Sequence, residues 1–279
     1  MSNYDYDENG NIRNGSNQRM FGFGSASPFV RKVQQIKETD STSCSYKGIL
    51  LKIAFFMLLI AGGFVVDLLV HKYGGDIYFV DSDKGFTTTK MELYLAIACG
   101  IGFVFGTIIA SFIRPTIPVA GSIAFFSIGY LVGMLGSIIP TYWDIILIAL
   151  AVTFALVFSM AIVYATKIVK VDGNFYKVLF TLLGAYLLGG LIIMILYFVP
   201  ATRSTIIAMI NSRWWVLLIG AIVILIGCMF LLSDFNAIQR SVENNLPKKY
   251  EWMCAFSLTY TIVWIYLRVL DILARLRRD

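Results

Sequence analysis

Seven long apolar blocks dominate the sequence and restrict the fold that the chain can adopt. They cover about residues 49–70, 91–113, 117–139, 143–165, 175–199, 214–233 and 253–273. The first six each reach the roughly 20 residues that a helix needs to cross the hydrocarbon of a bilayer. A backbone inside a bilayer must satisfy its own hydrogen bonds, so blocks of this length form helices. The sequence therefore predicts an all-α, polytopic membrane helix bundle with seven transmembrane helices.

The composition supports a membrane protein over a soluble one. The chain is 58% hydrophobic and 14% charged, whereas an ordinary soluble domain is about 45 to 50% apolar and about 25% charged. The net charge of +6 comes from basic residues beside the apolar blocks, where they set orientation. We therefore expect contact with the lipid bilayer and no binding of nucleic acid.

The seventh block differs from the others because its apolar stretch stops after Leu267, where Arg268 and Asp271 enter. Two interpretations remain open: a short helix buried among the others, or a re-entrant segment. Before the first block, residues 1–47 are rich in Asn, Ser, Gly, Asp and Lys, a composition typical of disorder. We expect a disordered cytoplasmic tail over residues 1–47 and a seven-helix membrane domain over residues 48–279.

Basic residues in the connectors indicate which side of the membrane the N-terminus occupies. With the N-terminus inside, the inner set is Arg31, Lys32, Lys37, Lys47, Arg114, Lys167, Lys170, Lys177, Arg240, Lys248 and Lys249, and the outer set is Lys72, Lys84, Lys90, Arg203 and Arg213. The excess of basic residues on the inner side predicts a cytoplasmic N-terminus. The terminal Arg275, Arg277 and Arg278 conflict with this orientation if the seventh segment crosses fully.

Glycines recur within three of the blocks and allow neighbouring helices to approach closely. They are Gly100, Gly102 and Gly106 in the second block, Gly129, Gly133 and Gly136 in the third, and Gly184, Gly189 and Gly190 in the fifth. We expect them to mark close packing, and a role as hinges is the alternative.

Charged residues inside a bilayer cost at least about 2.5 to 3.5 kcal/mol at a helix centre, so each one needs a reason. Lys52, Asp67 and Asp144 lie near block ends, where they can reach the headgroups. We expect them to be interfacial, and His71, which ends the first block, is expected to be interfacial as well.

A second group of charges could act together. Arg114 ends the second block and Asp234 the sixth, and both blocks end on the predicted cytoplasmic side. Arg268 and Asp271 lie three residues apart on one helix face and can pair. These four residues could form a gate. Alternatively, Asp234 caps the following segment and Arg114 anchors at the headgroups.

No catalytic motif is present in the sequence. It contains neither GxSxG nor HExxH, and its single histidine has no partner nearby in the sequence. The four cysteines lie far apart without a CxxC. We therefore expect no enzyme activity, no cofactor, no zinc site and no disulfide framework.

Several segments of the sequence are distinctive. The most specific are Leu232–Ile238, Tyr250–Phe256 and Trp264–Leu267, and further ones are Ser27–Phe29, Lys167–Val171 and Asn174–Phe175. Together they resemble the Bax-inhibitor family, specifically its longer-tailed bacterial branch. The resemblance implies a seven-helix membrane protein whose last helix is enclosed by the other six. It also implies a pH-sensitive calcium leak channel in a bacterial plasma membrane.

The resemblance assigns roles to the four charged residues. In the family, an acid that ends the sixth helix shares a proton with an acid in the seventh helix, and an arginine at the end of the second helix latches the closed form. Asp234 matches the first acid, and Arg114 lies at the position of the arginine. The family's acid directly after Tyr-Leu is replaced by Arg268, with Asp271 one turn later. The predicted function is thus a pH-sensitive cation leak, calcium being the expected ion, with Asp234, Asp271, Arg114 and Arg268 as the gate. The alternative is a non-conducting regulator that binds a partner such as a membrane quality-control protease.

Overall fold

The computed structural model describes residues 43–73, 77–81, 86–138 and 143–277. Seven of its helices are long and apolar enough to cross a membrane. They are α2 (Tyr46–Tyr73), α3 (Lys90–Phe112), the η1–α4 segment (Arg114–Thr116 and Ile117–Ile138), α5 (Trp143–Ala165), α6 (Gly173–Phe198), α8 (Arg213–Glu243) and α9 (Tyr250–Arg277). The prediction of an all-α, polytopic helix bundle is confirmed.

A β-hairpin and one short helix were not predicted. The strands β1 (Ile77–Asp81) and β2 (Phe86–Thr89) pair antiparallel between α2 and α3. The 12-residue helix α7 (Pro200–Asn211) joins α6 to α8, and its first residue is a proline, which suits the first turn of a helix. Both elements lie in connectors, where the apolar pattern carries no information.

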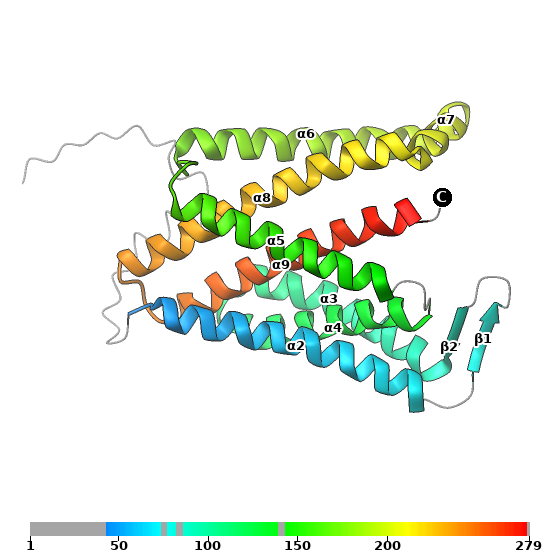
Figure 1. Cartoon of the computed structure of the whole chain (residues 1–279), viewed down its shortest axis with the longest axis horizontal. Coiled ribbons are helices and arrows are strands. Elements are labelled where there is room, and N and C mark those ends of the chain that lie inside the picture. The colour runs from blue at the N-terminus through cyan, green and yellow to red at the C-terminus, as the bar shows by residue number, and fades with distance from the viewer. Residues whose placement is uncertain (1–42, 74–76, 82–85, 139–142, 278–279) are drawn as a thin grey trace, which may run out of the picture. The chain divides into compact units, whose positions relative to one another are not determined.

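The seventh spanning helix is central but not short. In Figure 1, α9 runs between α8 and α2, and it also packs on α5 and α4. Of its candidate span 56% is buried inside the protein, against 6% for α6, while α4 reaches 61%. The prediction of a short or re-entrant segment is therefore wrong, because α9 is one continuous helix of 28 residues. Three of its polar residues, Glu251, Thr259 and Thr261, are buried in the interior.

Antiparallel packing of α8 on α9 is fixed by close contacts along the pair. A Cβ added at Gly220 would lie 2.5 Å from the Ile272 side chain, and one at Gly227 would lie 2.7 Å from Ile265. Residue numbers thus rise along α8 as they fall along α9. This register decides which residues of α9 can meet Asp234.

Glycines also bring α2 and α4 into close contact. A Cβ at Gly63 would collide with the backbone oxygen of Phe126, and a Cβ at Gly129 with that of Ile60. The predicted close packing is confirmed for the third block. It is wrong for the fifth, because a Cβ at Gly184, Gly189 or Gly190 would meet nothing within 4 Å.

The boundary of the predicted tail also shifts. Residues 1–42 lie outside the described residues. Beyond them Cys44 is buried, its N–H donates to Leu246 O at 2.7 Å, and Ser43 bridges to Pro247. Residues 43–47 therefore belong to the folded bundle, next to the connector between α8 and α9.

Candidate functional site

Asp234 lies inside α8, because this helix continues to Glu243. Its carboxylate is 9% exposed and accepts two hydrogen bonds from α9: Ser257 Oγ donates to Oδ1 at 2.7 Å and Thr261 Oγ1 donates to Oδ2 at 2.6 Å. Ser257 and Thr261 are four residues apart, so both hydroxyls project from the same face of α9. Asp234 therefore joins α8 to the central helix and does not cap a following segment.

Asp271 does not share the Asp234 site. It lies ten residues beyond Thr261 on α9, which is about 15 Å along a helix. Its carboxylate accepts from Arg275 Nε at 2.9 Å, and both side chains are 43% exposed. The predicted pair of proton-sharing acids is therefore absent from this structure, because the helix register brings hydroxyls and not a second carboxylate to Asp234.

Arg268 likewise lies away from Asp234. Its guanidinium donates to the hydroxyl of Tyr186 on α6 at 2.9 Å and lies 6.0 Å from the ring centroid of Trp264. A shallow pocket is lined by Arg268, Asp271 and Arg275 of α9 together with the start of α8. Arg268 and Asp271 thus line a largely apolar pocket with the start of α8, at the opposite end of that helix from Asp234.

Arg114 begins the short turn η1 between α3 and α4 and is half-buried. Ile117, three residues later, belongs to the same apolar cluster as Val242 and Leu246. The start of α4 therefore packs into the same apolar cluster as the end of α8. The placement of Arg114 near Asp234 and its role as a latch remain predictions.

Lys52 is not an interfacial side chain. Its ammonium forms an ion pair with Glu251 at the start of α9, and the two side chains are 14% and 1% exposed. Ser45 donates to Glu251 Oε1 from its backbone N–H at 3.0 Å and from its hydroxyl at 3.2 Å. The Glu251 carboxylate also packs directly against Gly48. The first turn of α2 is therefore in close contact with the start of α9.

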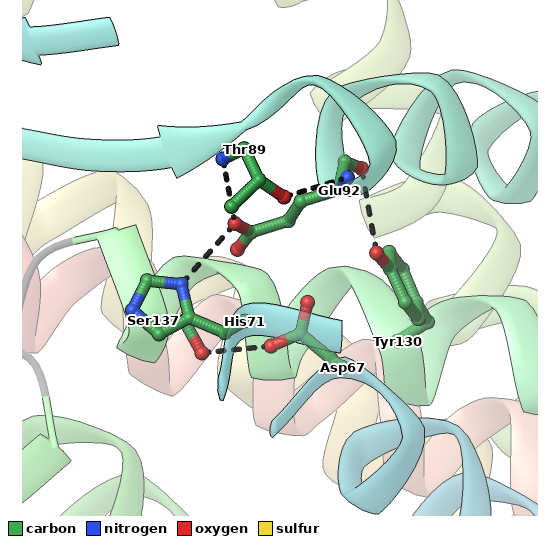
Figure 2. Close-up of polar contacts among 6 residues, drawn as sticks. All are labelled: Asp67, His71, Thr89, Glu92, Tyr130 and Ser137. Atoms are coloured by element: carbon green, nitrogen blue, oxygen red, sulfur yellow. Dashed lines mark hydrogen bonds and ion pairs between the residues drawn. The ribbon is translucent and has the colours of Figure 1, made fainter. Parts of the chain in front are cut away.

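A second buried acidic cluster joins the ends of α2, α3 and α4 on the hairpin side (Figure 2). Thr89 caps α3 in a capping box, in which Glu92 N donates to Thr89 Oγ1 at 3.2 Å and Thr89 N to Glu92 Oε2 at 3.3 Å. The same Glu92 oxygen lies 3.2 Å from His71 Nδ1. Tyr130 of α4 donates to Glu92 O at 3.3 Å. Glu92 is thus fixed by contacts from three elements.

Asp67 completes this cluster, one turn before His71 on α2. It is 0% exposed, and Ser137 of α4 donates to its Oδ2 at 2.8 Å. The expectation that Asp67 reaches the headgroups is wrong, because the carboxylate points into the contact between α2 and α4. We name Asp67, His71, Thr89, Glu92, Tyr130 and Ser137 the α2–α4 acidic cluster.

The sequence held two signals for the α2–α4 acidic cluster. The spacing of Asp67 and His71 places both on one face of a helix. Thr89-Lys90-Met91-Glu92 before an apolar run is a capping-box pattern. Among the residues that the structure describes, no group of three or more His, Cys, Asp and Glu side chains is arranged to hold a metal ion.

The fold and these sites define a polytopic helical membrane protein with buried carboxylates at both ends of a bundle built around α4 and α9. A family model described as Bax inhibitor 1 like matches residues 24–278. The chain belongs to this family. No curated protein matches the chain.

Proposed function

We propose that this protein is a pH-sensitive cation leak pathway, with calcium as the expected ion, in which Asp234 is the gating group. The observation that supports the proposal is the contact between Asp234 and the central helix. Asp234 is 9% exposed, and both of its carboxylate oxygens accept hydrogen bonds from hydroxyl groups of α9. A change in the charge of Asp234 would alter both bonds at once, and with them the position of α9 against α8.

Oxygen ligands at this position suit a hard cation. Ca²⁺ binds carboxylate and other oxygen ligands and takes six to eight of them, many from water. Asp234, Ser257 and Thr261 present oxygens on two helices that pack side by side. In the proposed gate, a cation or a proton competes with the hydroxyls for the carboxylate, and Arg114, at the same end of the bundle, favours the closed form.

The proposal includes an orientation and a location for the protein. The protein lies in a bacterial plasma membrane with its N-terminus and the connector of Lys248 and Lys249 in the cytoplasm, as the basic residues predict. The function is transport and not catalysis.

A second candidate function is supported by the contacts at the start of α2. Ser43, Cys44 and Ser45 contact Pro247, Leu246 and Glu251, respectively, at the turn before α9. A partner such as a membrane protease, bound to the preceding residues, could act on the central helix through this attachment. A regulator of this kind would not need to conduct ions.

The test of the gate is the pH dependence of ion flux in proteoliposomes. Asp234→Asn keeps the shape of the side chain and removes its charge, so flux should lose most of its pH dependence between about pH 5 and 8. Asp271→Asn is the matched control, because Asp271 is half-exposed and distant from Asp234. An Asp234→Asn profile that overlays the wild type, with wild type conducting, would show that Asp234 only joins α8 to α9.

A further inference from the structure

The carboxylate of Asp67 in the α2–α4 acidic cluster is only half satisfied by hydrogen bonds. Asp67 is 0% exposed, and its Oδ1 has no hydrogen-bond partner, while Oδ2 accepts from Ser137. In Figure 2 the free oxygen points towards the side on which Glu92 lies. A buried polar group without a partner is costly, so this oxygen needs an explanation.

The groups around Asp67 do little to offset the free-energy cost of burying a negatively charged carboxylate. Those that face it are Ser137 and Tyr130 from α4, Glu92 and Cys99 from α3, and His71 from α2. Of these, His71 alone can carry a positive charge, and its Nδ1 faces Glu92 and not Asp67. A buried ion without a paired charge costs several kcal/mol. A proton on Asp67 removes that cost.

His71 connects the buried acids to the surface. Its side chain is 34% exposed, whereas those of Asp67 and Glu92 are 0% exposed. One ring nitrogen contacts Glu92, which leaves Nε2 for exchange with water. Histidine is the side chain best suited to pass protons near neutral pH.

We propose that Asp67, Glu92 and His71 form a proton-binding site in which Asp67 holds the proton and His71 exchanges it with solvent. The site lies at the end of α2, far from Asp234, and is independent of ion conduction. Loss of the proton places a charge beside Gly133, where α2 and α4 nearly touch, and so loosens this contact. With the N-terminus in the cytoplasm, the site senses the pH outside the cell.

Infrared difference spectroscopy of the full-length protein in nanodiscs tests where the proton resides. All samples carry Asp234→Asn, so that the carboxyl group of Asp234 does not contribute. Between about pH 5 and 8 this protein should show the carbonyl band of a protonated carboxylic acid, and adding Asp67→Asn should abolish it. Adding Asp144→Asn, an exposed acid, should leave it unchanged.

Ser137→Ala provides a second variant if Asp67→Asn does not fold. It removes the hydrogen bond to Asp67 Oδ2 and should shift the carbonyl band to higher wavenumber without abolishing it. A spectrum without the band in the parent protein, or a band that neither variant alters, would overturn the assignment of the proton to Asp67.

The exchange role of His71 has its own readout. After a pH jump, His71→Gln should slow the change of the band by about tenfold or more, because the amide cannot carry the proton. Lys72→Gln, a change in the exposed neighbour, should leave the rate at the wild-type value. An unchanged rate in His71→Gln would refute the exchange role.

Discussion

Replacing Lys52 with methionine tests whether the buried ion pair holds the start of α2 on the central helix. The change leaves the Glu251 carboxylate, 1% exposed, without its cation. Removing one partner of a buried pair costs about 3 to 5 kcal/mol. Glu251 Oε1 keeps both donors from Ser45, so we expect the lower end, about 3 kcal/mol of the free energy of unfolding. The loss includes the cation–π contact at 5.2 Å between Lys52 and the Trp252 ring.

The assay is unfolding of the purified protein by SDS in mixed micelles, followed by circular dichroism. Lys47→Met is the matched control, because Lys47 is exposed and should change the free energy of unfolding by less than about 0.5 kcal/mol. Combining Lys52→Met with Glu251→Gln should cost clearly less than the two single changes added together, because no charge is then left buried. A Lys52→Met protein as stable as Lys47→Met would refute the reasoning.

Three further predictions concern packing, burial and topology. Gly129→Ala should destabilise the protein by about 1 to 3 kcal/mol, because the new Cβ would collide with the Ile60 backbone oxygen. Gly189→Ala should be neutral or stabilising, because a Cβ there meets nothing within 4 Å. Equal effects of the two changes in the SDS unfolding assay would contradict the observed α2–α4 contact. Burial raises the pKa of the Cys44 thiol to about 12. A protein whose sole cysteine is Cys44 should therefore resist labelling by maleimide at pH about 8 and react once it is unfolded. Fast labelling of the folded protein would show that residues 43–47 are not packed. A cysteine placed at Lys248 in a cysteine-free background should be labelled only from the cytoplasmic side, and labelling from outside intact cells would reverse the proposed orientation.

Spanning helices could be predicted from the sequence because long apolar runs permit no other structure in a bilayer. Two boundaries failed for the same reason. The sixth apolar block ends at about residue 233, before Asp234, and the clean apolar stretch of the seventh stops after Leu267, before Arg268, because a charge interrupts hydropathy. The helices themselves continue to Glu243 and Arg277. Both charges are accommodated inside the bundle, because Asp234 accepts hydrogen bonds from the hydroxyls of Ser257 and Thr261, and Arg268 donates one to Tyr186.

The candidate site was only partly predictable. Asp234 and Arg114 stand out in the sequence as charges at the ends of apolar blocks, and the start of α4 packs in the same apolar cluster as the end of α8. The partners of Asp234 could not be predicted, because they depend on the register between α8 and α9, which close contacts at Gly220 and Gly227 fix. The sequence predicts an interfacial position for Asp67, because its place along α2 does not reveal that α4 covers it.

Calcium flux into liposomes that contain only the purified protein tests the central claim most directly. With a calcium indicator trapped inside, vesicles with the wild-type protein should fill faster than protein-free vesicles, and the rate should change with pH. Vesicles with folded, monodisperse protein that fill no faster than empty ones at any pH would contradict a leak pathway and support a non-conducting regulator.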